Sequence, residues 1–126
     1  MKKILVPTDF SDNALKAALY AAEIAQRNGA VVFFLNTAIV GIEKLEEPLP
    51  LHDKYAAIVL DEIKNDLEKF RSSVTSVFTT IKTEVALMDG PVIESIVSFS
   101  ANNAIDLVVM GTKGASGIKE VLIGTV

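Results

Sequence analysis

Short aliphatic runs alternate along this chain with longer segments in which apolar residues recur every three or four positions. The runs occupy residues 3–7, 31–35 and 107–110, and alternating apolar residues at 81–87 indicate one further strand. Strands that alternate with helices form a mostly parallel sheet, because a helical crossover is the usual connection between parallel strands. Unbroken aliphatic runs are typical of strands covered on both faces. The sequence therefore predicts an open parallel sheet between helices, a three-layer α/β/α fold.

Three of the intervening segments have the spacing of amphipathic helices. The first begins near Ser11 or Asp12, either of which is a suitable N-cap, and Gly29 fits its C-terminal end. A second, longer helix is predicted over residues 55–74, and a third over 93–99 after a turn that contains glycine and proline. After the last predicted strand comes a glycine loop, and a final helix is expected to begin beyond it.

Length and composition fit one domain. The chain has 126 residues, of which 50% are hydrophobic, and this length suffices to bury roughly two thirds of the unfolded surface. Residues 39–53 are rich in glutamate and proline and are predicted as an exposed loop, not as a linker between domains.

The composition also disfavours several kinds of partner. No apolar run approaches the roughly 18 residues that cross a bilayer, and the apolar N-terminal stretch ends at Pro7, too early for a signal peptide. The chain has no cysteine, which suits a reducing cytosol. A net charge of −4 without any basic run disfavours nucleic acid. We therefore expect a cytoplasmic protein that binds neither membranes nor nucleic acid.

The clearest functional signal lies in residues 106–126. The aliphatic run is followed by Gly111, Gly114 and Gly117, and a short amphipathic stretch then ends at Gly124-Thr125. A strand, a glycine loop and the start of a helix direct free backbone N–H groups and the positive end of a helix dipole at an anion. Glycine helps because it permits positive φ and has no Cβ to hold a phosphate away. The segment therefore predicts a site for the phosphates of a nucleotide.

Two common phosphate-binding motifs do not match these glycines. A Walker loop requires Gly-Lys-Ser/Thr at a set distance from its first glycine, and no such sequence follows. The dinucleotide fingerprint G-x-G-x-x-G has a different spacing and follows the first strand of its domain, whereas these glycines follow the last predicted strand.

The spacing resembles instead the G-x2-G-x9-G-S/T signature of the ATP-binding branch of the universal stress protein family. Gly111, Gly114 and Gly124-Thr125 take its positions, and residues 106–110 are similar to the fourth strand of that family. Residues 3–9, Lys-Ile-Leu-Val-Pro-Thr-Asp, are similar to its first strand. The resemblance covers essentially all of the chain. It implies a Rossmann-like sheet of the adenine nucleotide alpha hydrolase-like type, in strand order 3-2-1-4 followed by a fifth strand.

In such a sheet a ligand binds beyond the carboxyl ends of the strands, where the strand order reverses. That reversal lies between the first and fourth strands, which carry the two motifs. By resemblance, Gly114, Gly124 and Thr125 contact the phosphates. Lys113 lies between two motif glycines, and from that place it is expected to offset the phosphate charge, although the family varies at this position. The alternative is that Gly111 and Gly114 merely shape a turn and that Lys113 is solvated.

The nucleoside end of the expected site comes from the ends of three strands. The resemblance implies that Asp9 lies against ribose and adenine, with Pro7 and Thr8 as the adjoining wall; an Asx turn is the alternative for Asp9. Thr37 takes the position that usually packs against adenine. Met110 is expected to form a further wall, although a methionine at a strand end also fits the core.

The resemblance also implies a longer chain. Family members usually continue past the position of Val126, which closes the pocket in the family, through the rest of the last helix and a fifth strand that often pairs subunits. Without that strand, residues 107–110 would have an exposed apolar edge. We therefore interpret residues 1–126 as a single domain without the fifth strand. It is either a fragment or one half of a tandem protein, and it is expected to pair with a partner domain or as a homodimer.

Two functions remain open. The first is ATP binding, with Mg²⁺ or Mn²⁺ held through the phosphates, where nucleotide occupancy regulates conformation, oligomerisation or partner binding in a stress response. The second is a dimerising stress scaffold of the same fold that binds no nucleotide. The sequence shows no candidate catalytic triad, and its one histidine, His52, has no partner at ligand spacing. We therefore expect no dedicated enzyme, and any ATP hydrolysis is expected to be slow.

Overall fold

The computed structural model describes residues 1–38, 50–111 and 121–125, and at 50–54 and 121–125 it describes the backbone alone. The predicted alternation of strands and helices is confirmed as far as the fourth strand. In chain order the elements are β1 (Lys3–Pro7), α1 (Asp12–Asn28), β2 (Val31–Ala38), α2 (Pro50–Thr75), β3 (Lys82–Asp89), α3 (Val92–Asn102), β4 (Leu107–Gly111) and β5 (Val121–Thr125).

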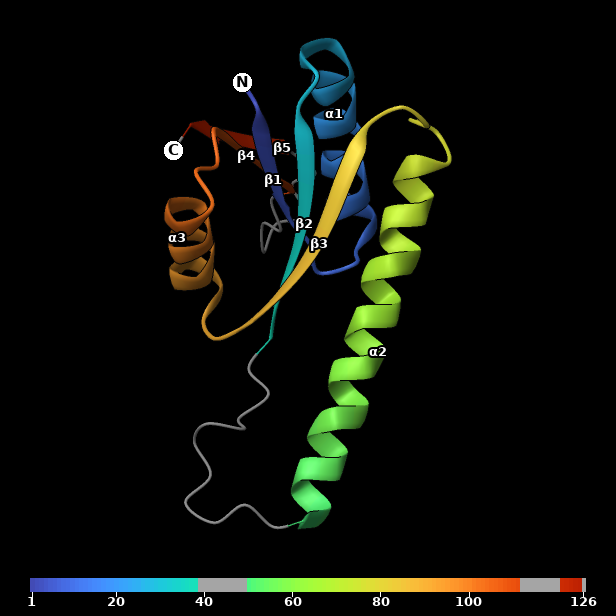
Figure 1. The fold of residues 1–126 in the computed structure, drawn as a ribbon, viewed down its shortest axis with the longest axis vertical. Coiled ribbons are helices and arrows are strands. Elements are labelled where there is room, and N and C mark those ends of the chain that lie inside the picture. Colours follow the sequence, from blue (N-terminus) through green and yellow to red (C-terminus); the bar gives the residue numbers. More distant parts are fainter. Residues whose placement is uncertain (39–49, 112–120, 126) are drawn as a thin grey trace.

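The strands form one sheet in the order β3-β2-β1-β4-β5. The first four run parallel to one another, which confirms the predicted order 3-2-1-4. Figure 1 shows α1 and α2 along one face of this sheet and α3 on the other. The described elements therefore have the predicted three-layer arrangement, with β1 in the middle of the sheet.

The core has two parts, because alternate residues of a strand point to opposite faces of the sheet. Ile4 and Val6 of β1 pack with buried residues of α1 and α2, among them Phe70. Leu5, between them, packs with Ile96 of α3. All three β1 side chains are fully buried, so after Lys3 the next polar side chain is Thr8, just past the end of β1.

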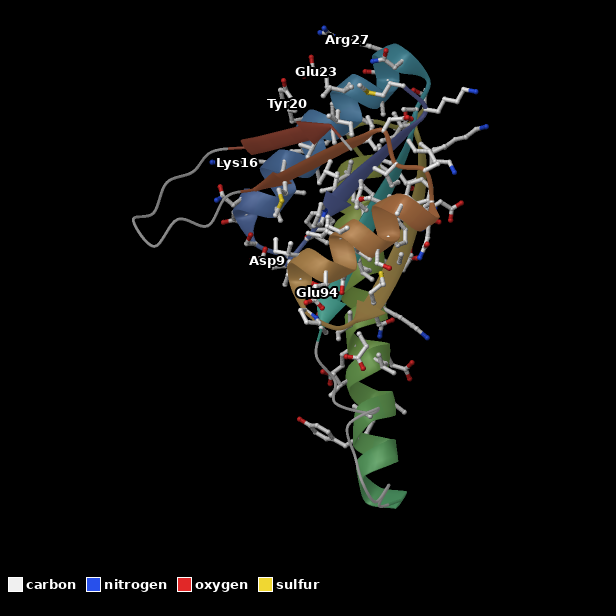
Figure 2. The ribbon with its side chains drawn as sticks, turned by 90° about the vertical axis from the view of Figure 1, so that its left-hand side faces the viewer. Asp9, Lys16, Tyr20, Glu23, Arg27 and Glu94 are labelled. Carbon is white, nitrogen blue, oxygen red and sulfur yellow. The ribbon has the colours of Figure 1, made fainter. Side chains whose placement is uncertain are left out.

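The close packing of α1 on the sheet follows from a face built of alanines. Its buried residues are Ala14, Ala17, Ala18, Ala21, Ala22 and Ala25. Figure 2 shows longer side chains along the same helix, including Lys16, Tyr20, Glu23 and Arg27. Both predicted ends are confirmed, since the Ser11 hydroxyl accepts the N–H of Ala14 and Gly29 adopts a left-handed conformation with φ of 68°.

The end of the chain differs from the prediction. Residues Val121–Thr125 form β5 antiparallel to β4, so they do not begin a helix, and the edge of β4 does not lack a neighbour. Both predictions are wrong for the same physical reason. The backbone groups along β4 need hydrogen-bond partners, and the aliphatic residues at 121–123 suit a strand that supplies them.

The long helix α2 begins at Pro50, earlier than the predicted start at Tyr55. Proline is tolerated there because the first turn of a helix leaves its N–H groups without intrahelical partners. The rest of the predicted exposed loop, residues 39–49, lies outside the described residues. In the part of the chain that the structure describes, no helix is both long and apolar enough to span a membrane.

Candidate functional site

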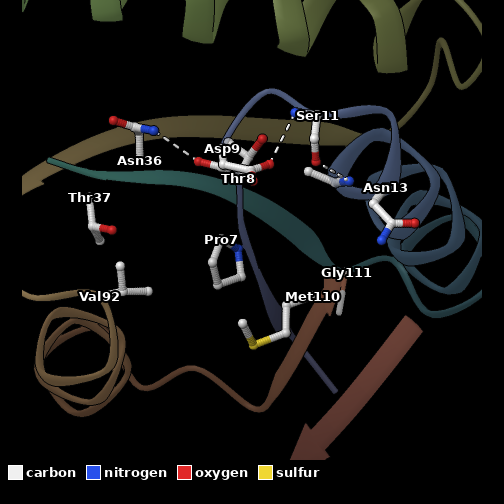
Figure 3. Close-up of a pocket in the computed structure, with 11 residues that line it drawn as sticks. Pro7, Thr8, Asp9, Ser11, Asn13, Asn36, Thr37, Val92, Met110 and Gly111 are labelled. Atoms are coloured by element: carbon white, nitrogen blue, oxygen red, sulfur yellow. Dashed lines mark hydrogen bonds between the residues drawn. The ribbon is translucent and has the colours of Figure 1, made fainter. Parts of the chain in front are cut away.

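A pocket of about 280 Å³ opens at the carboxyl ends of β1, β2 and β4 (Figure 3). The strand order reverses here, because the chain leaves β1 toward β2 on one side and later returns to β4 on the other. Open α/β sheets bind ligands at this kind of position. The lining residues come from these strands, from the turn between β1 and α1, and from the starts of α1 and α3: Pro7, Thr8, Asp9, Ser11, Asn13, Ala14, Asn36, Thr37, Val92, Met110 and Gly111.

The turn that follows β1 is held at Thr8, which is buried. The N–H of Thr8 donates to the carbonyl of Leu35 at 2.8 Å, and the carbonyl of Thr8 accepts the side-chain amide of Asn36 at 2.9 Å. The Thr8 hydroxyl accepts the N–H of Phe10 at 3.0 Å. These bonds tie the first residue of the turn to β2 and to the turn itself, so the pocket wall is pre-formed.

The next residues bring a carboxylate and a helix end to the same wall. A carboxylate oxygen of Asp9 accepts the N–H of Ser11 at 3.0 Å, and Ser11 in turn caps α1. Asp9 is the one formally charged side chain among the described lining residues. The N-terminus of α1, a helix of 17 residues, adds a partial positive charge beside it.

The pocket has an apolar part and a polar part. Figure 3 shows Pro7, Met110 and Val92 together, with Thr37 at the end of β2 above Val92. Asp9 lies above Pro7 in this view, between Asn36 and Ser11, and Asn13 lies at the start of α1. A ligand with a flat apolar group and a polar tail matches this division.

The comparison with known proteins decides the family. The sequence profile of the universal stress protein family matches residues 1–126. This chain belongs to the universal stress protein family. The universal stress protein MJ0531 of Methanocaldococcus jannaschii is 32% identical over 128 residues, an alignment that covers 99% of this chain and 72% of the relative.

Solved structures agree on the fold. The structure of protein MJ0577 from the same organism matches with a TM-score of 0.70 and 25% identity, over 98% of this chain and 82% of that one. A universal stress protein in complex with cAMP matches with a TM-score of 0.65 and 18% identity, over 85% of this chain and 69% of that one. At 18% identity the latter likeness is one of fold alone.

The structure brings together those predicted site residues that end the strands. Pro7, Thr8 and Asp9 line the pocket beside Thr37 of β2, and Met110 and Gly111 of β4 complete the opposite side. These predicted residues therefore line one pocket, and their contact with a nucleoside stays a prediction. Lys113, Gly114 and Val126 lie outside the described residues.

Close packing requires glycine at position 111. A Cβ at this position would lie 2.8 Å from the carbonyl oxygen of Asn13 and 3.3 Å from the N–H nitrogen of Ala14. The end of β4 thus approaches the backbone of the first turn of α1 so closely that only glycine fits. This glycine is required by the fold whether or not it also faces a phosphate.

Gly124 and Thr125 do not lie at the pocket in this structure. In the antiparallel pairing of β4 and β5, Gly124 lies opposite Val108 and Thr125 opposite Leu107. At the rise of a β-strand, Val108 is roughly 10 Å along β4 from Gly111, the β4 residue at the pocket. The two residues are therefore near the amino end of β4, and their predicted contact with phosphates stays a prediction.

The sequence analysis did not predict five of the lining residues as part of the site: Ser11, Asn13, Ala14, Asn36 and Val92. Asn36 could have been found, because it is a polar residue directly after a buried run at the edge where the ligand is expected. Val92 could have been found too, since the turn after β3 brings the start of α3 to that edge. Among the described residues, no group of three or more His, Cys, Asp or Glu side chains could hold a metal ion.

Proposed function

We propose that this universal stress protein binds an adenine nucleotide, ATP, in the pocket at the carboxyl end of β1. One observation carries the proposal. A pocket with an apolar end and a polar end lies at the reversal of strand order, beside the strand that leads into the glycine motif. A nucleotide is divided in the same way, with a flat base at one end and charged phosphates at the other.

The proposed orientation follows from the two ends. The base lies against Pro7, Met110 and Val92, where burial of its faces is favourable. The ribose hydroxyls donate to the carboxylate of Asp9. The phosphates extend toward the N-terminus of α1 and the loop after β4, where Gly114 and Lys113 are expected to contribute. Gly124 and Thr125 join them only if β5 leaves its pairing with β4.

A divalent cation fits the same arrangement. The described pocket residues supply one carboxylate and no basic side chain, so the charge of a triphosphate needs a counter-charge from elsewhere. We propose that Mg²⁺ or Mn²⁺ is held mainly through the phosphates, since the described residues contain no cluster of metal-ligating side chains.

The relative solved in complex with cAMP supports the ligand class, because cAMP is itself an adenine nucleotide. We infer that occupancy of the pocket changes a surface or an assembly that partners recognise in a stress response, within the cytoplasm. Pairing with a second domain, in a homodimer or a tandem protein, is part of this proposal. Slow hydrolysis is compatible with it, but a dedicated enzymatic role is not proposed.

One observation favours the alternative, a dimerising scaffold that binds no nucleotide. The G-T pair of the motif is engaged in β5 and lies away from the pocket. If this pairing persists in solution with ATP present, the phosphates lose two of their expected contacts.

The experiment uses the absorbance of the purified protein. The chain has no tryptophan and two tyrosines, so an adenine retained through purification would dominate its spectrum near 260 nm and would be released on denaturation. Calorimetric titration of ATP with Mg²⁺ would then compare wild type with Gly114→Glu, which places a carboxylate in the expected phosphate loop. We expect the variant to lose at least tenfold in affinity, because like charges repel at close range.

Ala101→Glu is the matched control, because it adds the same charge on the exposed face of α3 at its C-terminal end. This control should bind ATP as wild type does. Equal ATP affinity of Gly114→Glu and wild type would mean that the glycine loop does not contact the phosphates. If wild type binds no ATP, the alternative function, a scaffold that binds no nucleotide, is favoured.

A further inference from the structure

Asn36 is a buried polar side chain whose hydrogen bond crosses between two walls of the pocket. It lies near the end of β2, with 8% of its surface exposed. Its side-chain amide donates to the carbonyl of Thr8 at 2.9 Å. The preceding residue, Leu35, accepts the N–H of the same Thr8 at 2.8 Å. β2 thus holds both backbone polar groups of Thr8, one through its main chain and one through a side chain.

The carbonyl held by Asn36 belongs to the peptide unit that joins Thr8 to Asp9. A peptide unit is planar, so the direction of this carbonyl also sets the direction of the Asp9 N–H and the position of the Asp9 Cα. Figure 3 shows the hydrogen bond from Asn36 reaching this peptide, with Asp9 directly beyond it. The side chain of Asn36 therefore acts on Asp9 without having to touch the ligand.

The turn needs such a restraint because it contains an unfavourable backbone conformation. Phe10 follows Asp9 with φ of 66°, in the left-handed region that an aromatic residue rarely adopts. Conformations of this kind persist where surrounding contacts hold them. Two of the contacts are the bonds from the Phe10 N–H to the Thr8 hydroxyl and from Asn36 to the Thr8 carbonyl. If the second is lost, the Thr8–Asp9 peptide can rotate and the turn can relax.

We propose that Asn36 is a positioning residue for ligand recognition, which holds the Thr8–Asp9 peptide so that the Asp9 carboxylate meets the ribose hydroxyls of the nucleotide. This inference rests on the proposed function. It adds Asn36, which acts through Asp9. It also adds a measurable consequence, which is that the protein discriminates between a nucleotide with ribose hydroxyls and one without them.

The test measures the dissociation constants of ATP and 2′,3′-dideoxy-ATP, with Mg²⁺, for wild type, Asn36→Leu and Asp9→Asn. Leucine has the branched shape of asparagine, with two larger methyl groups at its end, and lacks the donor. We expect Asn36→Leu to weaken ATP binding about tenfold, the range of one hydrogen bond to a charged group, and to change the binding of the dideoxy nucleotide less than twofold. In the Asp9→Asn background the same substitution should weaken ATP binding less than threefold, because the two residues act in series.

A second readout needs no ligand. In the free protein, amide hydrogen exchange at Phe10 should be about tenfold faster in Asn36→Leu than in wild type, because the turn opens more often. The matched control is Asn28→Leu, which removes a side-chain amide bonded at 2.9 Å to the carbonyl of Ile24, at the far end of α1. The control should leave both the nucleotide discrimination and the exchange at Phe10 unchanged. If Asn36→Leu fails to fold, Asn36→Ala replaces it in both measurements.

The two proposals fail in different ways. Wild type that binds neither nucleotide overturns the proposed function, and this inference with it. Wild type that prefers ATP, beside an Asn36→Leu protein with the same preference and the same exchange at Phe10, overturns the positioning role alone. Equal weakening of both nucleotides in Asn36→Leu also overturns it, because that result indicates general damage to the pocket.

Discussion

An aspartate accepts backbone N–H groups at each end of β1, but the surroundings of the two aspartates differ. At the amino end, one carboxylate oxygen of Asp106 accepts the N–H groups of Lys2 and Lys3, at 2.8 and 3.0 Å. At the carboxyl end, Asp9 accepts the N–H of Ser11 and lines the pocket. Both residues are exposed aspartates bonded to backbone, so residue type does not separate them.

Topology separates them. At the amino end the chain returns from α3 into β4, and Lys3 Nζ closes this side with a bond to the carbonyl of Asn103 at 2.9 Å. At the carboxyl end the chain leaves β1 for α1 and the crossover to β2, whereas β4 lies on the other side of β1, and the pocket opens at these strand ends. We therefore propose that an aspartate next to a parallel strand has a structural role at the amino end of the sheet and is available to a ligand at the carboxyl end.

The largest effect that would test this contrast is expected at Gly111, which lies at the pocket end. Gly111→Ala puts a Cβ within 2.8 Å of the Asn13 carbonyl oxygen, and backbone must move to admit it. We expect the free energy of unfolding to fall by about 2–4 kcal/mol, as for other forced insertions into a packed site. Urea denaturation followed by circular dichroism measures it.

Gly29→Ala is the comparison at the opposite end of the sheet. There a Cβ meets nothing within 4 Å, and only the positive φ of 68° opposes alanine, so a loss of about 1 kcal/mol is expected. Equal losses at the two glycines would contradict the close approach of β4 to α1.

A paired substitution of the two aspartates should give opposite results. Asp9→Asn is expected to weaken ATP binding about tenfold, since a hydrogen bond to a charged acceptor is lost, with little change in thermal stability. Asp106→Asn should lower the midpoint of thermal unfolding and leave the ATP affinity unchanged. Calorimetric titration measures the ATP affinity of each variant, and thermal melts measure its midpoint of unfolding. A loss of affinity in Asp106→Asn would mean that the two ends of β1 are coupled.

The pH dependence of stability tests the structural role of Asp106 at the amino end of the sheet. Hydrogen bonds from the Lys2 and Lys3 N–H groups hold the pKa of Asp106 below its ordinary value of 3.8. A depressed pKa means that the carboxylate stabilises the fold fully above the ordinary value and loses this contribution as the pH falls through the folded pKa. Wild type should therefore lose its stability advantage over Asp106→Asn on acidification. Melting curves collected at decreasing pH measure it, and a constant gap between the two proteins would contradict the assignment.

The smallest effect is expected at Ala104, in the turn that precedes β4 at the amino end. Its φ of 53° is unfavourable for alanine, and its side chain is exposed. Ala104→Gly should raise the free energy of unfolding by about 0.5 kcal/mol, because relief of the left-handed strain exceeds the entropy that glycine adds to the unfolded chain. Ala101→Gly, in the last turn of α3, should lower it by about 0.5 kcal/mol, less than in a helix interior. Losses at both positions would contradict the left-handed turn.

Local patterns in the sequence determined much of this protein. Aliphatic runs and helical periodicity predicted the parallel strands and the three helices, and Ser11 and Gly29 predicted the ends of α1. These features could be read from the sequence because each depends on residues that are close together in the chain.

Only the tertiary structure decided three other points. Whether residues 121–125 pair with β4 or begin a helix depends on an unpaired strand edge. The need for glycine at Gly111 depends on the backbone of α1, and the use of Asn36 depends on a carbonyl 28 residues earlier in the chain. Each of these is a contact between distant segments, and periodicity and capping carry no information about which distant backbone group a residue will meet.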